Sequence, residues 1–538
     1  MRFFLIINKL INAHRMRAND KDRGEKMKKR FVLLMALVLA LTVMIAGWSP
    51  MLSDDDANGD GIKDTLVIGT AAEINTLDLQ TQNDQINNIV LKTTHETLLY
   101  PTNDGQLLPK LAESYEYDDS KTGLTLHLRK DVKFSDGTPM TSADVKFTLE
   151  SALKSNAASS IGGLKSVDIV DDYTVKLNLE SYDNEFLANL ASVPISIQSK
   201  AAYDSGMDKP YLIGTGPYKF EEWKSGEYVS VVRNENYWDP ANAGKVERII
   251  WKPILEASSR VIALQNGEID VAIDPPINEL DNLQNDKNIT VFEKPGTRLF
   301  YFAFNVTKAP WDNKTLRQAV ACAINRDDVL DVAVYGKGTK QKTILNRGLW
   351  GFYDDMEGFD YDLDRAKKLM ADAGYPNGGI ETTMLIANSN PYSNIATVIQ
   401  ADLQQIGINV KITEVEDATL KQMCRDGEQE LYLWRWNEDQ KDDWVYRDLF
   451  YTGSSSNFQH YSSDKADQLI DAVRTEPDQD KRYKEGVELQ EYLVDECPQV
   501  PLYIANLVIA YRKGLKGDYF FGGGNHDWSH AYIDLSVK

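Results

Sequence analysis

The sequence predicts a mixed α/β protein, because segments typical of strands alternate with segments typical of amphipathic helices. The chain has 538 residues, a length that corresponds to about three domains of ~100–200 residues each. Hydrophobic residues make up 42% of the chain, which suffices for packed cores and excludes wholesale disorder. We therefore expect a folded protein of several domains.

The N-terminal segment has the composition of an export signal. Residues 1–30 carry ten Lys or Arg and three Asp or Glu, and an apolar run from Phe31 to Ala46 follows. This run is shorter than the ~20 apolar residues that usually span a bilayer, so the pattern favours a signal peptide over a membrane anchor. We expect a signal peptide at 27–47. Residues 1–26 are then an upstream extension or, alternatively, a cytoplasmic tail.

The end of the apolar run resembles a bacterial lipobox, but Trp48 stands where the lipidated Cys would be. Without a thiol no thioether to lipid can form, so a lipid anchor is not expected on this sequence as it stands. Residues 48–61 read as a short acidic linker. Within them, 56–61 resembles the start of a calcium loop, but Val67 replaces the final Glu, which favours a plain acidic tether.

The first half of the chain is rich in strand patterns. Thr141-x-x-Asp144 forms a capping box, which predicts a helix that continues to about residue 154. Asp136-Gly137-Thr138-Pro139 reads as a turn before that helix. Strands are expected at 66–69, 124–129, 174–179 and 228–233.

The second half repeats the alternation of strand and helix. A strand–helix–strand unit runs from residue 382 to residue 412, which implies two parallel strands. Gly374 ends the helix that precedes this unit, and Gly407 ends the helix within it. Helices are expected at 362–373, 394–405, 466–475 and 481–494.

Charge and motifs exclude several classes of function. After residue 30 the chain has 49 basic and 78 acidic side chains, and such an acidic protein repels nucleic acid. Phosphate-loop, zinc-protease, nucleophile-elbow and Cys-x-x-Cys motifs are absent from the sequence. His526 and His530 are four residues apart, but Trp528 and the glycines at 522–524 argue against a metal-binding helix. We expect no metal, no cofactor and no catalytic residues, although a hydrolase with paired carboxylates stays open.

One long block resembles the family-5 extracellular solute-binding proteins, which are the peptide-, dipeptide- and nickel-binding receptors of ABC importers. It comprises Leu111–Tyr115 and Leu126–Val145. Further blocks match in order, and together the resemblance covers about residues 62–535. They lie at 76–78, 214–220, 236–238, 266–270, 304–305, 316–320 and 324–326.

The resemblance implies a two-lobed clamshell of the periplasmic-binding-protein type (type II, cluster C) with an additional third domain. Lobe I would be discontinuous, at 62–95, 205–304 and 506–538. The additional domain would occupy 96–204 and lobe II 305–505. A hinge closes such lobes around the ligand, so the buried polar groups of the ligand need partners on the walls.

The resemblance also implies ligand-binding residues. In peptide-binding members, a Trp and an Asp three residues later form part of the site, and the Asp pairs with the peptide's α-ammonium. The match falls on Trp436 and Asp439, with Asp442 and Asp443 as alternatives. A buried cation needs such a partner because desolvation costs several kcal/mol. The other candidates are Asn83, Asp84, Gln85, Tyr301, Asn305, Asn390, Tyr392, Trp434 and Arg435.

Two of these candidates bear on specificity. Asn390 falls where the dipeptide branch carries a basic residue for the ligand carboxylate, which argues against a dipeptide-only site. Arg435, between Trp434 and Trp436, is a hypothetical carboxylate partner. A packed strand end is the alternative interpretation of this aromatic stretch.

The predicted function is capture of peptides by the extracytoplasmic component of an ABC importer, at the cell surface or in the periplasm. Its expected partners are the permease subunits, with membrane association through the transporter or an N-terminal anchor, and no nucleic acid. The alternative within binding proteins is a receptor for a metal chelate, glutathione or an oligosaccharide. A secreted hydrolase fits less well, because the resemblance opposes it.

Overall fold

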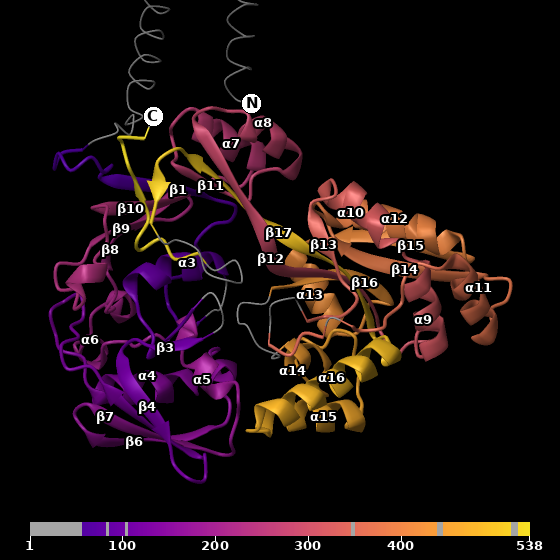
Figure 1. Cartoon of the computed structure of the whole chain (residues 1–538), viewed down its shortest axis with the longest axis horizontal. Helices are drawn as coiled ribbons and strands as arrows, with labels where there is room; N and C mark the ends of the chain where they lie inside the picture. The colour runs from indigo at the N-terminus through magenta and orange to yellow at the C-terminus, as the bar shows by residue number, and fades with distance from the viewer. Residues whose placement is uncertain are drawn as a thin grey trace, which may run out of the picture. The chain divides into compact units, whose positions relative to one another are not determined.

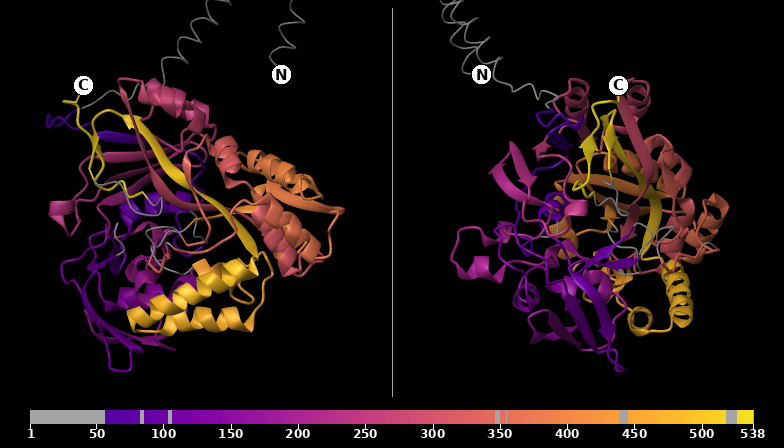
Figure 2. Two further views of the ribbon diagram at one scale, coloured as in Figure 1. Left: turned by 45° about the vertical axis from the view of Figure 1, so that its right-hand side comes forward. Right: turned by 60° about the vertical axis from the view of Figure 1, so that its left-hand side comes forward.

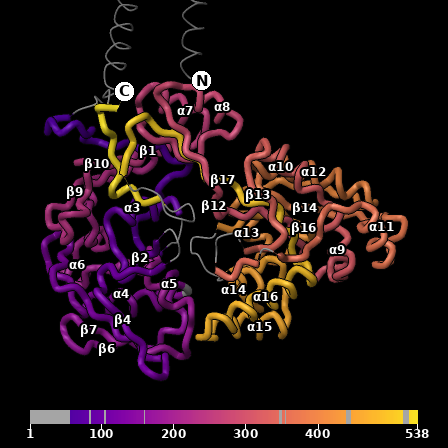
Figure 3. The backbone as a smooth tube through the Cα atoms, viewed as in Figure 1, coloured from indigo at the N-terminus to yellow at the C-terminus, as the bar shows by residue number. Residues whose placement is uncertain are grey.

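The computed structural model describes residues 56–81, 85–102, 106–345, 350–353, 355–437, 445–517 and 526–537. The predictions for the signal peptide, Trp48, Asn83, Asp84, Asp439, Asp442 and Asp443 lie outside the described residues. Residues 56–538 form one compact unit, to which the description below applies. Figures 1 and 3 follow the course of the chain through this unit.

The largest element is an eleven-stranded sheet, as counted over the described segments. Its order is β15-β14-β16-β12-β17-β11-β1-β10-β9-β8, and β13 pairs with β17 beside this path. The two longest strands, β12 (Ile289–Phe304) and β17 (Gln499–Arg512), pair antiparallel in the middle of the order and lie side by side in Figure 1. They therefore connect the two halves of the sheet.

One half of the sheet is built around β1 (Thr65–Thr70), which pairs in parallel with β10 (Arg248–Pro253) and β11 (Val271–Ile273). Its apolar side chains form a core that includes Leu66, Ile68 and Trp251. We call this the β1 core. Its other elements are β8 (Tyr218–Lys224), β9 (Tyr228–Arg233), α3 (Gln85–Thr94), α7 (Ala257–Gln265) and α8 (Leu280–Gln284).

The other half contains the expected strand–helix–strand unit. β14 (Ile380–Ala387) pairs in parallel with β15 (Ile408–Val415), and α12 (Tyr392–Gln404) connects them. The surrounding core, which we call the β14 core, contains the buried Cys322. The other elements of this half are α9 (Lys314–Ala323), α10 (Arg326–Val334), β13 (Gly338–Lys340), α11 (Leu363–Asp372), α13 (Asp417–Arg425), β16 (Leu431–Asn437), α14 (Val445–Phe450), α15 (Asp464–Thr475) and α16 (Gln479–Glu496).

A separate four-stranded antiparallel sheet has the order β4-β5-β7-β6 and its own hydrophobic core. Helix α4 (Ser142–Ala152) packs on it, and the predicted capping box is present, with the backbone N–H of Thr141 donating to Asp144 Oδ2 at 2.8 Å. We call its core the β5 core. Its strands are β4 (Ala112–Tyr117), β5 (Gly123–Leu128), β6 (Leu164–Asp171) and β7 (Thr174–Leu179).

Short elements complete the fold. Two small two-stranded sheets pair β2 with β3 and β18 with β19. The bounds of these elements are β2 (Leu99–Pro101), β3 (Leu107–Pro109), α5 (Phe186–Asn189), α6 (Lys200–Asp204), β18 (Leu515–Lys516) and β19 (Tyr532–Ile533).

The segment just after β7 contacts the C-terminal end of α15, far along the chain. Asn184 Nδ2 donates to three backbone carbonyls there, those of Val473 at 3.3 Å, Arg474 at 3.0 Å and Glu476 at 2.7 Å. Arg474 Nη2 donates to Asp183 Oδ2 at 2.6 Å. Figure 2 shows the neighbouring helices α15 and α16 in yellow. These contacts join the segment that follows the small sheet to the helices of the β14 half.

Residues 56–61, which the sequence assigns to the linker, form a compact turn. The backbone N–H groups of Asp60 and Gly61 donate to the Asp56 carboxylate, each at 2.9 Å, and Asn58 Nδ2 donates to Glu247 Oε1. Each oxygen of the Asp56 carboxylate therefore accepts one hydrogen bond from the backbone of the turn. Across the described residues, no cluster of three or more His, Cys, Asp or Glu side chains is arranged to bind a metal ion.

The helices differ from membrane-spanning ones in length and polarity. Within the segments that the structure describes, every helix is too short or too polar to cross a membrane.

Candidate functional site

The candidate site lies on one face of the sheet where β16, β12 and β17 run side by side. Arg298 and Phe300 of β12 stand opposite Asn437 and Arg435 of β16, respectively. On the other side of β12, Phe300 stands opposite Tyr503 of β17. Because side chains alternate between faces along a strand, these five residues share one face.

An irregularity in β12 turns Arg298 onto this face. The register between β12 and β17 shifts between Pro295 and Arg298, so Pro295 pairs with Asn506 and Arg298 with Ala505. Gly296 lies within the shift, where a Cβ atom would come within 2.6 Å of the Ala505 carbonyl oxygen. Such a bulge changes which residues face each side of the sheet.

Aromatic rings form the floor of the site. The rings of Phe300 and Tyr503 stack with centroids 5.0 Å apart and planes 8° from parallel. Tyr392, the first residue of α12, packs against Phe300 at 5.6 Å and against Trp434 at 6.4 Å. These rings fix the positions of the polar groups that lie among them.

Arg435 is held in place by two partners. Its Nη1 donates to the Tyr392 hydroxyl at 2.5 Å and its Nη2 to Asp417 Oδ2 at 3.1 Å. Burial by itself would lower the pKa of Arg435, but Tyr392 and Asp417 together raise it above its usual value. The guanidinium therefore stays charged and already has a carboxylate partner.

His526 brings cations from separate elements together. It is 3% exposed, and burial together with Lys92, Lys294 and Arg298 lowers its pKa to about 3. Lys92 belongs to α3 of the β1 half, whereas Lys294 and Arg298 belong to β12. The neutral imidazole thus lies where positive side chains from two parts of the chain gather.

The structure separates the predicted site residues into groups. Arg435 and Tyr392 contact each other, whereas Trp436, the next residue of β16, is half-buried and by strand alternation belongs to the opposite face of the sheet. Gln85 is half-buried as the first residue of α3, and Asn390 is exposed just before α12.

Three predicted residues lie in the β14 core. Trp434 is 6% exposed and Tyr301 is fully buried, with its ring edge-on to Tyr432. Asn305 is 1% exposed, and its Nδ2 donates to the carbonyls of Gly427 and Gln429 at 3.2 Å. Packing and backbone contacts account for these three side chains, so we do not place them against the ligand.

Sequence reasoning missed Arg298, Tyr503 and the cation cluster around His526. One signal was present in the sequence, since Gly296 precedes Arg298 at the start of the apolar run 299–304. The pairing that aligns Arg298 with Asn437 and Phe300 with Tyr503 joins segments more than 130 residues apart, and no local pattern reveals it.

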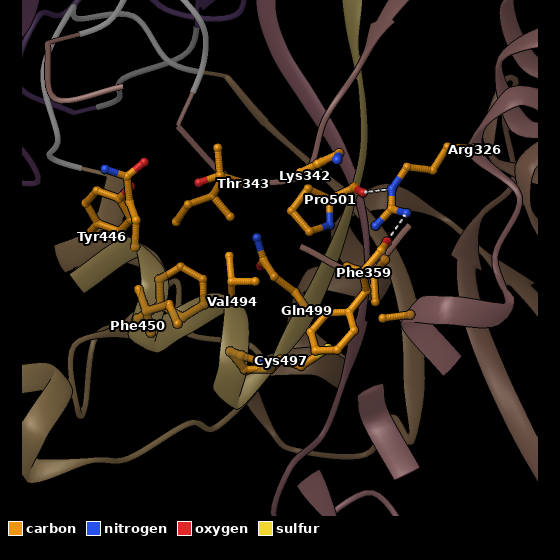
Figure 4. A pocket seen from close by; sticks show the side chains of 16 residues that line it. Arg326, Lys342, Thr343, Phe359, Tyr446, Phe450, Val494, Cys497, Gln499 and Pro501 are labelled. Atoms are coloured by element: carbon orange, nitrogen blue, oxygen red, sulfur yellow. Dashed lines mark hydrogen bonds between the residues drawn. The ribbon is translucent and has the colours of Figure 1, made fainter. Parts of the chain in front are cut away.

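A separate small cavity of about 30 Å³ lies among α10, α14, α16 and β17 (Figure 4). Arg326 borders it and donates from Nε to the Pro501 carbonyl and from Nη1 to the Phe359 carbonyl, each at 2.8 Å. Gln490 and Gln499 also line it. The predicted ligand residues are not among its lining, so we treat this cavity as part of the packing around α16.

Comparison with known proteins places this geometry among solute receptors. The family model of bacterial extracellular solute-binding proteins, family 5 Middle, matches residues 106–458. Heme-binding protein A of Haemophilus influenzae is 30% identical over 73% of this chain and 78% of its own length. The glutathione-binding protein GsiB of Escherichia coli is 28% identical over 84% of this chain and 91% of its own.

Solved structures agree with the sequence relatives. The periplasmic binding protein DppA of Helicobacter pylori, associated with an ABC transporter and solved with the peptide STSA, superimposes with a TM-score of 0.78. It is 27% identical, and the match covers 87% of this chain and 98% of that one. The predicted two-lobed clamshell of mixed α/β type is thereby confirmed.

Proposed function

Because the chain belongs to the family 5 bacterial extracellular solute-binding proteins, we propose that it captures peptides outside the cytoplasmic membrane and delivers them to the permease of an ABC importer. The observation that carries this proposal is the match over residues 106–458, together with the peptide-bound relative that aligns over almost its whole length. Binding and release require no catalytic group, and we propose none.

The aromatic and charged groups of the site support this function. Asp439, two residues beyond the end of β16, pairs with the ammonium group of the peptide, and Trp436, on the opposite face of β16 from Arg435, forms a wall at the end of the strand. Gln85, at the start of α3, contributes from the β1 half, with Asn83 and Asp84 before it.

The proposed domains follow from the cores. Lobe I, at 62–95, 205–304 and 506–538, contains most of the β1 core, and lobe II, at 305–505, contains most of the β14 core. The additional domain, at 96–204, contains the β5 core. Since β12 and β17 pass from one half of the sheet to the other, they are the proposed hinge.

Localisation follows from the family and the N-terminal pattern. A signal peptide at 27–47 exports the chain, and association with the membrane arises through the transporter rather than a lipid, because Trp48 offers no thiol. Replacing Trp48 with Cys should convert the exported protein into one that sediments with membranes. Membrane retention of the unaltered chain in cells that lack the transporter would contradict this expectation.

A second candidate ligand is glutathione or another anionic solute. Two arginines, Arg298 and Arg435, share the site face, and one relative is named for glutathione binding. The test is mass spectrometry of ligands released from protein purified under native conditions. Peptides in the released fraction support the proposed function, whereas glutathione alone favours the second candidate, and glycans or metal chelates contradict both.

The role of Asp439 can be tested with a matched variant. Asp439→Asn should weaken binding of the released peptides at least tenfold, because the ammonium loses its carboxylate partner. Asp464→Asn, at an exposed first-turn position of α15, serves as the control and should bind normally. Equal affinity of the two variants would contradict the assignment.

A further inference from the structure

Arg298 differs from Arg435 in how its charge is satisfied. Arg298 is half-buried, and its Nε donates at 2.9 Å to Asn437 Oδ1, a neutral amide. Within the described residues it forms no ion pair. Arg435, one strand away, is paired with Asp417 at 3.1 Å. Among the described residues, a carboxylate therefore partners one arginine of this face and only an amide partners the other.

Arg298 is one of three cations that act electrostatically on His526. Lys92, Lys294 and Arg298 all act on the buried His526, which is neutral and offers no countercharge. An arginine fork with two free N–H positions matches the geometry of a carboxylate.

A buried hydroxyl completes the arrangement. Tyr503 is fully buried, and its hydroxyl has no hydrogen-bond partner among the residues that the structure describes. Burial raises the pKa of Tyr503, so the group stays protonated and can donate. Tyr503 stands opposite Phe300, two positions along the same face from Arg298, a diagonal that long side chains can bridge.

We propose that the Arg298 guanidinium and the Tyr503 hydroxyl form a carboxylate-binding subsite on the hinge strands. The cargo is then a small peptide or peptide-like molecule with a free carboxylate at this end, which rests on the proposed function above. The subsite takes the role that a basic residue at position 390 would have, since Asn390 carries no charge there. It lies on β12 and β17, so carboxylate binding acts directly on the strands that connect the two halves of the sheet.

The inference predicts discrimination between free and capped carboxylates. Purified protein, stripped of its ligand by mild unfolding and refolding, is offered an equimolar tetrapeptide library, half free acids and half C-terminal amides, with glutathione and its diethyl ester added. Native mass spectrometry ranks the bound probes. The wild-type chain should retain free acids at least tenfold over their capped counterparts.

Variants locate the discrimination. Arg298→Gln should lose at least tenfold affinity for the retained free acids and treat acid and amide alike, and Tyr503→Phe should lose about threefold to tenfold. Arg298→Lys keeps the charge but not the fork, and should retain part of the preference. Arg365→Gln, on the exposed face of α11, is the control and should match wild type.

The possible outcomes distinguish failure of the subsite from failure of the proposed function. Equal retention of acids and amides by the wild-type chain overturns the subsite but leaves peptide capture standing. If a folded Arg298→Gln variant still prefers free acids, another part of the protein binds the carboxylate. That result also overturns the subsite. A wild-type chain that retains no probe overturns both the subsite and the proposed function.

Discussion

At the scale of single residues, the hydrogen-bond partners of the arginines distinguish structural side chains from candidate binding side chains. Arg317 and Arg326 donate to backbone carbonyls inside the β14 half, as expected for structural side chains. Arg435 pairs with a carboxylate of its own chain, whereas the one hydrogen bond of Arg298 to a described residue goes to an amide. The same residue type therefore serves packing, positioning and, in our proposal, ligand recognition.

Arg317 should be required for stability. It is 4% exposed and donates to the carbonyls of Trp311, Asp312, Glu496 and Cys497 at 2.6–3.3 Å. Arg317→Met leaves these buried acceptors without a donor, and we expect a loss of about 2–4 kcal/mol in the free energy of unfolding. Urea unfolding measures it, with the exposed Lys367→Met as control. A loss below that of the control would contradict this role.

Buried histidines should make stability depend on pH. Burial lowers the pKa of His95 to about 4 and is the larger of the two causes acting on it. In the unfolded chain the pKa is about 6.5, so the unfolded state binds the proton first as the pH falls. The contribution of neutral His95 to the free energy of unfolding is therefore complete above pH 6.5 and is lost as the pH falls from about 6.5 to 4. The loss is at most about 1.4 kcal/mol for each pH unit.

The slope of unfolding free energy against pH distinguishes the effect of His95 from that of other titrating groups. His95→Gln should make the plot of unfolding free energy against pH shallower between about 6.5 and 4.5, whatever its effect at neutral pH. Chemical denaturation at several pH values measures the slope. An unchanged slope in the variant would mean that His95 does not stay neutral in the folded protein.

At the scale of elements, local sequence predicted helices and strands well because their signals are short-range. The capping box at 141–144 begins α4, and alternation at 174–179 matches β7. The parallel pairing of β14 with β15 was also predicted, and it is confirmed. The bulge in β12 was not, because it depends on how β12 pairs with a strand about 200 residues away.

Two glycines should respond in opposite ways to an added methyl group. Gly296→Ala places a Cβ 2.6 Å from the Ala505 carbonyl, so β12 and β17 must separate locally, at a cost of about 1–3 kcal/mol. Gly486, inside α16, has no atom within 4 Å of the place that a Cβ would take. Gly486→Ala should stabilise by about 0.5–1 kcal/mol, because alanine loses less entropy in a helix.

Thermal and urea unfolding compare the two variants under one condition. Opposite signs of the change in unfolding free energy are the expected pattern, and Gly296→Ala should also weaken ligand binding because Arg298 lies in the same bulge. Stabilisation by Gly296→Ala would show that the close approach of the two strands is not as described.

At the scale of the whole unit, a contact remote from the candidate site joins the segment after the small sheet to the β14 half. Asn184 closes the carbonyl end of α15, and Asp183 is paired with Arg474. Unsatisfied carbonyls at a helix end need such donors. Any movement that separates these parts must break this contact, so it contributes to the free energy of closing around a ligand.

Asn184→Ala should therefore loosen this arrangement without touching the site. We expect faster hydrogen exchange in peptides that cover 182–190 and 470–478, and roughly threefold to tenfold weaker ligand binding. Asn178→Ala, on β7 of the same small sheet, is the control. Unchanged exchange at the end of α15 would show that the contact does not hold the two parts together.

The sequence by itself determined the fold class, most helix and strand positions and the family. Hydrophobic periodicity, helix caps and motif blocks all depend on residues that are close together in the chain. It also named Trp436, Arg435 and Tyr392 as candidates. Only the tertiary structure decided that Trp434, Tyr301 and Asn305 belong to the core, and that Arg298 and Tyr503 share a face with Arg435. Those relations arise from strand register and a bulge between distant segments, and side-chain alternation carries no information about which distant strand will lie alongside.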